Sequence, residues 1–159
     1  MKELDSYLND HLAGSVGALE LIAHWKNAHR GESLGAFFTD LEADISADQA
    51  RLRDLMHCLG IEESKVRQAG AWAAEKIGRA RFVIAGDERG GLGLVLALEG
   101  LIMGIVGKRL MWHALAALNL PKLQGFDFEE LQRRAEEQIA RTEAERMRAT
   151  QRAFASPVG

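Results

Sequence analysis

Polar and ionisable side chains interrupt the apolar pattern of each long helical stretch that this sequence predicts. His11 and Ser15 stand one helical turn apart, and Asp48 and Glu99 each have apolar neighbours three or four residues away on both sides. The last stretch places three more polar residues at the same spacing, Gln138, Thr142 and Arg146. Imidazole and carboxylate groups can bind metal ions or carry protons. The pattern therefore predicts one buried polar cluster that contains His11, Ser15, Asp48, Glu99, Thr142 and Arg146.

Two interpretations of this cluster follow from the cost of burying charge, because a buried ion must be paired or hydrogen-bonded. In the first, His11, Asp48 and Glu99 hold a mononuclear iron or zinc ion through mixed nitrogen and oxygen ligands. In the second, the same groups form a neutral network, His11 with Asp48 and Arg146 with Glu99, which fixes the register of the helices. Arg146 favours the second interpretation, since its guanidinium supplies the positive charge that a metal ion would otherwise supply.

Apolar residues at spacings of three and four predict the helices that carry these groups. Ser33 and Asp127 are suitable N-caps, Glu130 completes a capping box with Asp127, and Gly60 is a suitable helix stop. The chain of 159 residues is expected to form a single domain over residues 1–159, with 155–159 as a frayed tail. The predicted helices cover about 4–29, 33–59, 62–80, 92–118 and 127–154.

The connections between these helices predict a particular bundle. The first two long helices, and likewise the last two, are joined by short connections, whereas the pairs are separated by a long connector that contains the short helix at 62–80. Two helical hairpins joined by one long crossover correspond to an all-α, ferritin-like four-helix bundle.

The segment YLNDHLAGSVGALELIAHW, the charged second helix and Glu99 in an apolar helix after the crossover together resemble the ferritin-like superfamily. The pattern is most similar to small bacterial members that are linked to stress responses. In that family each metal site takes one Glu from the first helix, one from the helix after the crossover, and a Glu-x-x-His pair from each partner helix. Glu99 matches the second of these positions, but the first falls on His11 or Ser15, and the last helix has no histidine. The resemblance implies a ferritin-like fold that lacks an intact di-iron centre.

The helix expected at 92–118 is apolar nearly all round. Leu96, Glu99 and Met103 mark its expected core-facing stripe. A second apolar face needs cover, which favours a homodimer. Glycines between the two faces leave a further alternative, a long apolar cavity for a lipid or another hydrophobic ligand along Gly100 and Gly104. The expected dimer interface consists of Leu94, Leu98, Leu101, Ile105 and Trp112.

The composition argues against a nucleic-acid-binding protein and against a membrane-spanning protein. Twenty basic and 23 acidic residues give a net charge of −3 with no basic block, which argues against a nucleic-acid partner. Glu99 stands in the middle of the most apolar segment, so no membrane span is expected. The single cysteine, Cys58, excludes an internal disulfide and fits a cytoplasmic protein.

The sequence favours a non-enzymatic helical bundle without a cofactor, with a stress-associated or protein-interaction role. The alternative is a redox or storage protein that binds iron or zinc through the three ligands named above.

Overall fold

The computed structural model describes residues 2–63 and 91–155, and within them the chain is helical with no β-strand. This confirms the predicted all-α class. Residues 64–80 of the helix expected at 62–80, and residues 156–159 of the tail, lie outside the described residues. The helices are α1 (Lys2–Ala28), α2 (Ser33–Leu59), α4 (Leu92–Ala117), the short 3-10 helix η1 (Pro121–Leu123) and α5 (Phe128–Phe154).

The helix ends follow local sequence signals in two of three expected places. Gly60 ends α2 with φ of 73°, a left-handed conformation that glycine adopts without strain. Asp127 caps α5 by accepting a hydrogen bond from the Glu130 amide at 2.9 Å. Ser33 is not the cap of α2 but its first helical residue. Glu32 holds the cap position without a side-chain cap, because its carboxylate lies 3.0 Å from Nδ1 of His29.

The turn between α1 and α2 depends on Gly35 in the first turn of α2. A Cβ atom there would lie 2.1 Å from the carbonyl oxygen of His29, closer than two such atoms can approach. Glycine therefore lets the backbone of the turn lie directly against α2.

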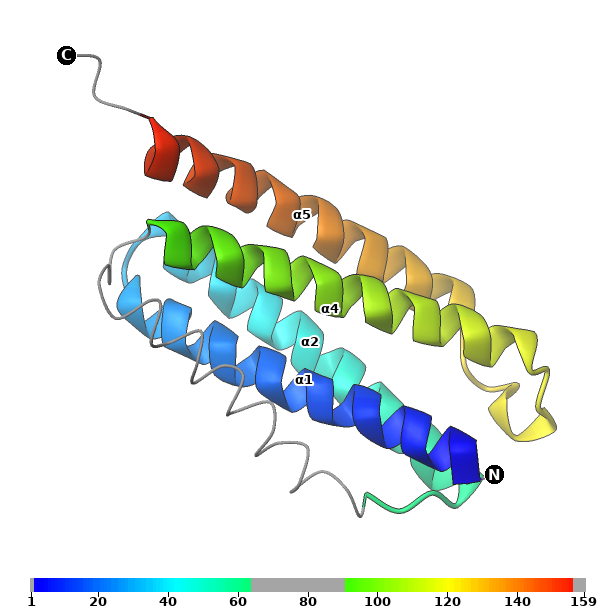
Figure 1. Ribbon diagram of the computed structural model, residues 1–159. Coiled ribbons are helices and arrows are strands. Elements are labelled where there is room, and N and C mark those ends of the chain that lie inside the picture. Colours follow the sequence, from blue (N-terminus) through cyan, green and yellow to red (C-terminus); the bar gives the residue numbers. More distant parts are fainter. Residues whose placement is uncertain (1, 64–90, 156–159) are drawn as a thin grey trace.

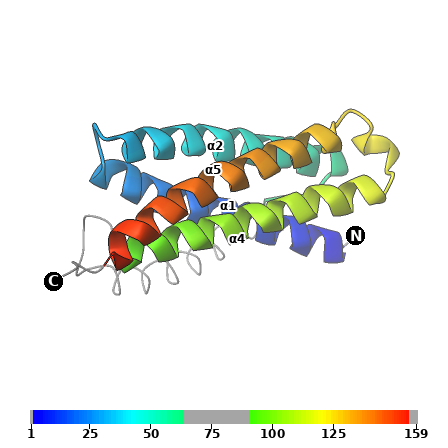
Figure 2. The same cartoon turned by 90° about the horizontal axis from the view of Figure 1, so that it is seen from above.

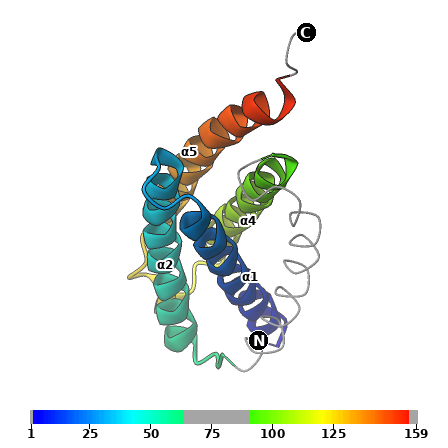
Figure 3. The same cartoon turned by 90° about the vertical axis from the view of Figure 1, so that its left-hand side faces the viewer.

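The four long helices form two antiparallel pairs, α1 with α2 and α4 with α5, as Figure 1 shows. Helices α2 and α4 run in the same direction (Figure 1). The connection that holds η1 lies at the opposite end from the α1–α2 turn (Figure 2). It spans residues 118–127, in agreement with the expected bounds of the two helices. Seen end-on in Figure 3, α1 lies beside α2, and α4 lies beside α5.

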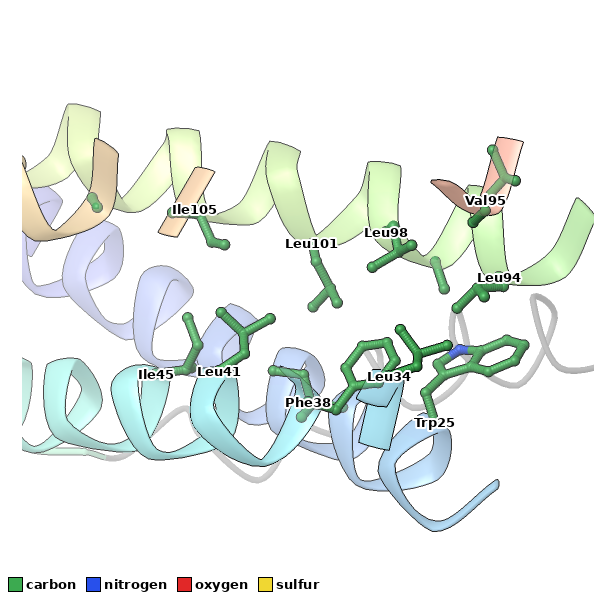
Figure 4. Close-up of a cluster of buried hydrophobic side chains, with 14 residues drawn as sticks. Trp25, Leu34, Phe38, Leu41, Ile45, Leu94, Val95, Leu98, Leu101 and Ile105 are labelled. Carbon is green, nitrogen blue, oxygen red and sulfur yellow. The ribbon is translucent and has the colours of Figure 1, made fainter. Parts of the chain in front are cut away.

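Two apolar clusters fill the bundle, one towards each end. The first contains Trp25 of α1 and Phe38 and Leu41 of α2, which meet Leu98 and Leu101 of α4 (Figure 4). The second, towards the η1 end, is built around Leu8, Leu55, Met56, Met111 and Trp112. Burial of such side chains is the main source of stability in a helical domain.

The buried face of α4 is the one assigned to a dimer interface in the sequence analysis, and this assignment is corrected. Leu94, Leu98, Leu101, Ile105 and Trp112 are at most 3% exposed and belong to the core of the chain itself. In contrast, Leu96 is 46% and Met103 is 74% exposed. Because both faces of α4 are apolar, periodicity could not decide between them. No helix in the described part of the chain is long and apolar enough to span a membrane.

Candidate binding groove and polar layer

A layer of polar side chains crosses the bundle between the two apolar clusters, with Asp48 of α2 at its centre. Asp48 is 2% exposed. Its Oδ2 accepts hydrogen bonds from Nζ of Lys108 at 2.5 Å and from Nε2 of Gln138 at 2.9 Å. A guanidinium nitrogen of Arg134 lies 3.3 Å from its Oδ1. One carboxylate thus joins α2 to both α4 and α5.

Lys108 is largely buried beside Asp48 and makes two hydrogen bonds. Its side chain is 14% exposed, and its ammonium group donates to Oε1 of Gln138 as well as to Asp48. Burial lowers the pKa of Lys108, because a desolvated ammonium group is less stable, and the negative charge of Asp48 opposes that shift. The paired carboxylate is therefore what allows a lysine to occupy this position.

A second set of hydrogen bonds joins α1 to α2 at the neighbouring level. Ser15 donates to the carbonyl oxygen of Leu12 at 2.6 Å and accepts from Nε2 of Gln49 at 2.8 Å. Oε1 of Gln49 accepts from Arg53 at 2.8 Å. Together with the hydrogen bonds of Asp48, Lys108 and Gln138, this set gives every one of the four long helices a polar contact with another helix.

Glu99 and Arg146 are found as a pair, as expected, but at the surface. They lie 3.5 Å apart, and the Glu99 side chain is 45% exposed. Arg146 also donates to both carboxylate oxygens of Glu143, at 2.6 and 2.7 Å. This pair lies on the outer side of α4, which follows from the orientation of that helix.

His11 and Thr142 also differ from their expected partners. His11 is half-buried and makes an edge contact with the ring of Tyr7, at 4.7 Å between centroids. Burial lowers the pKa of His11, and the nearby carboxylate of Asp10 opposes that change. Thr142 is fully buried and donates to the carbonyl oxygen of Gln138 on its own helix at 2.7 Å.

The expected single cluster is therefore divided, since Asp48 pairs with Lys108 rather than with His11, and Glu99 pairs with Arg146 elsewhere. Within residues 2–63 and 91–155, no three His, Cys, Asp or Glu side chains are grouped so that they could hold a metal ion. His11, Asp48 and Glu99 thus do not form a ligand set in this structure. The physical reason is that two basic side chains already surround Asp48.

The sequence analysis missed three polar residues. Lys108 and Arg134 lie beside Asp48, and Gln49 is hydrogen-bonded to Ser15. Lys108 follows Ile105 by three residues and precedes Trp112 by four, so it shares their face of α4. A lysine on an apolar face opposite a buried aspartate on another helix was the signal that could have identified it.

A groove opens beside this layer, between α1 and α4 with α2 at its base. This half-open groove has a volume of about 570 Å³. This volume lies within the range of small-molecule sites in proteins. Gly14 of α1 and Gly100 and Gly104 of α4 line the groove, and no described atom lies within 4 Å of where their Cβ atoms would be. The long apolar pocket expected along Gly100 and Gly104 is thus present in the described part of the chain. Its remaining walls include Ala18, Leu21, Ile45, Leu52, Leu101, Ile105 and Met111.

Polar groups of both charges line one part of the groove, whereas Leu21 and Gly100 lie in its apolar part. The polar lining consists of Tyr7, Asp10, His11, Ser15, Asp48, Gln49, Lys108 and Trp112. The indole Nε1 of Trp112 is buried and has no hydrogen-bond partner among the described residues. An unpaired buried donor costs free energy. The groove itself offers an apolar channel whose polar part holds two carboxylates and one ammonium group.

Comparison with known proteins gives no family: no family model, curated protein or solved structure matches this chain. Its function must therefore be inferred from the geometry described above.

Proposed function

We propose that this protein is a non-enzymatic helical-bundle protein that binds an apolar ligand in the α1–α4 groove. The observation that carries the proposal is the groove of about 570 Å³ beside three glycines that have open space at their Cβ positions. Side chains at these positions would fill the groove, whereas glycine keeps it open.

The proposal retains the ferritin-like arrangement and excludes an intact di-iron centre. The parallel direction of α2 and α4 supports two hairpins joined by a long crossover. The environment of Asp48 argues against a metal there, because Lys108 and Arg134 already supply positive charge to its carboxylate. A stress-associated role and a homodimer stay proposals that rest on the resemblance and on the apolar surface of α4.

The proposal is tested by titrating the protein with N-phenyl-1-naphthylamine, an apolar fluorophore that brightens when it leaves water. We expect saturable binding to the wild-type chain and a loss of affinity of at least about tenfold in Gly104→Phe, because the new ring fills the groove. Gly125→Phe is the matched control, since Gly125 lies in the exposed connection before α5 and does not line the groove.

The variant Gly104→Ala tests whether binding depends on the open space of the groove or on glycine itself at this position. One methyl group leaves most of the groove open and favours the helix by about 0.5–1 kcal/mol. We expect this variant to bind the fluorophore nearly as well as the wild type. Absence of saturable binding, or equal binding by Gly104→Phe, would overturn the proposal.

A further inference from the structure

We propose that a second copy of this chain binds the outer face of α4, with the two α4 helices packed antiparallel about a twofold axis at the level of Ile105. This inference goes beyond the binding of an apolar ligand, and it gives the homodimer named above a surface and an orientation. It depends on the order of large and small residues along the outer face of α4 and on the charges beside that face.

The outer face of α4 exposes a large apolar side chain at every seventh residue. Leu96, Met103 and Leu110 are 46%, 74% and 53% exposed, respectively. Residues seven apart stand nearly in line on a helix, so the three side chains form one stripe on the side opposite the buried Leu98 and Ile105. Contiguous apolar surface of this kind usually marks an interaction site.

Small residues stand between the large ones on this face. Each of the three large residues is followed after four positions by a small one, namely Gly100, Gly107 and Ala114. The alternation of spacings of four and three is the heptad pattern of helices that pack side by side. Within the described residues, the Cβ position of Gly100 has no atom within 4 Å, and that of Gly107 meets only Cε1 of His11, at 3.9 Å. Open space therefore alternates with projecting side chains along the face.

This order of residues is complementary to its own reverse. When two α4 helices run antiparallel, each large side chain of one copy lies opposite a small residue of the other: Leu96 opposite Ala114, Met103 opposite Gly107, and Leu110 opposite Gly100. The three pairs share one midpoint, at Ile105. Parallel helices would instead place large residues opposite each other and leave glycine opposite glycine. Because a symmetric dimer uses the same face on both partners, this match favours a second copy of the chain over a different helix.

The charges beside the stripe also favour the antiparallel orientation. Glu99 and His113 flank the stripe on the same side, two heptads apart. Glu99 shares the guanidinium of Arg146 with Glu143, so this group of three carries a net negative charge. His113 contacts the uncharged Gln132 at 3.1 Å, and its imidazole can carry a positive charge. Antiparallel helices place Glu99 of each copy beside His113 of the other, whereas parallel helices would bring the two Glu99 side chains together.

Sedimentation equilibrium of the full chain tests the surface. We expect the wild type to dimerise and Met103→Glu to raise the dimer dissociation constant at least about tenfold, because the new carboxylate would be desolvated in the interface. Met147→Glu is the matched control, since Met147 is also exposed, at 43%, but lies on α5. Met103 does not line the groove, so Met103→Glu should still bind N-phenyl-1-naphthylamine like the wild type. A loss of the dimer is thus distinguished from a loss of the ligand site.

Disulfide cross-linking in a Cys58→Ser background tests the orientation. Leu96 and Ala114 stand at opposite ends of the stripe, about 27 Å apart along the helix. In an antiparallel dimer each of these residues meets the other and not its own counterpart. Neither Leu96→Cys nor Ala114→Cys alone should therefore form a covalent dimer under mild oxidation, whereas an equal mixture of the two should.

Three outcomes would overturn the inference. The first is a wild-type chain that stays monomeric at its highest soluble concentration, as expected if residues 64–90 of the same chain cover this face. The second is a dimer that Met103→Glu leaves intact, which would place the interface elsewhere. The third is cross-linking of Leu96→Cys to itself, or no cross-linking in the mixture, either of which would exclude the antiparallel pairing.

Discussion

At the scale of single residues, Asp48 is 2% exposed, and its carboxylate meets groups from two other helices. Leaving one ion of such a pair without its partner is far more costly than losing an exposed pair, because the remaining charge stays desolvated. Asp44, on the same helix, pairs with Arg141 at the surface, with a side chain that is 33% exposed. The two aspartates therefore provide a matched comparison.

Asp48→Ala is expected to lower the free energy of unfolding by about 3 kcal/mol, since it leaves the Lys108 ammonium group without its carboxylate. Asp44→Ala should cost less than about 1 kcal/mol, as exposed ion pairs do. Urea denaturation of both variants measures the difference. Similar losses in the two variants would contradict the central place given to Asp48.

His11 should make the stability of the protein depend on pH on the acidic side. Burial lowers the pKa of His11 below its ordinary value of about 6.5, while the carboxylate of Asp10 opposes the shift. The unfolded chain then binds the proton more readily, so stability is fully present above about pH 6.5 and decreases as pH falls towards the folded-state pKa.

In the variant His11→Gln, the free energy of unfolding should decrease less as the pH falls, because the histidine that takes up the proton is absent. Unfolding free energies measured between about pH 5 and 8 for both proteins provide the check. Parallel pH profiles for the wild type and His11→Gln would show that His11 makes no such contribution.

The residue types at these positions could be identified from the sequence more readily than their partners. Asp48 and Thr142 were expected to be buried, and both are. The pairing of Glu99 with Arg146 was also expected and is found, although both were placed in the interior. Partners across helices depend on the rotation of each helix about its axis, which local spacing does not determine.

At the scale of the elements, α4 is the helix whose buried face could not be predicted from the sequence pattern. Its two apolar faces give periodicity no means of choosing the buried one. The other three long helices have polar faces, and their bounds agree with expectation to within about two residues. The orientation of α4 about its axis places Leu98 in the core, with 0% of its surface exposed, and leaves Leu96 46% exposed.

Leu98→Ala and Leu96→Ala test this orientation with identical changes on one helix. Leu98→Ala should destabilise the protein by about 2–5 kcal/mol through the cavity that it creates. Leu96→Ala should change stability by less than about 1 kcal/mol, because its side chain is half exposed in the folded chain. Denaturant unfolding gives both values, and the reverse order would indicate that α4 is turned the other way.

At the scale of the whole molecule, two helical hairpins lie side by side and are held together by a polar layer and two apolar clusters. Helices α1 and α4 belong to different hairpins, and glycines on both helices border the space between them. The groove is thus a consequence of how the hairpins meet, whereas the number and order of the helices follow from apolar periodicity. The glycines that line the groove could be identified from the sequence. The orientation of Lys108, which lines its polar part, could not.

Binding in the groove should also stabilise the whole domain, because the unfolded chain has no such site. At a dodecan-1-ol concentration one hundred times its dissociation constant, the free energy of unfolding should increase by about 2.7 kcal/mol. Thermal melts with and without the alcohol measure this increase, and Gly104→Phe should show little of it. An equal rise in that variant would place the bound alcohol outside the groove.

The most direct test of the groove as a binding site is methyl-resolved NMR of the protein with and without saturating dodecan-1-ol. Our account predicts shifts at the methyl groups of Leu21, Leu101 and Ile105, which line the groove, and smaller changes at Leu55 and Leu59, which are buried but do not line it. Absence of shifts at the lining residues, or equal shifts at Leu55 and Leu59, would contradict it.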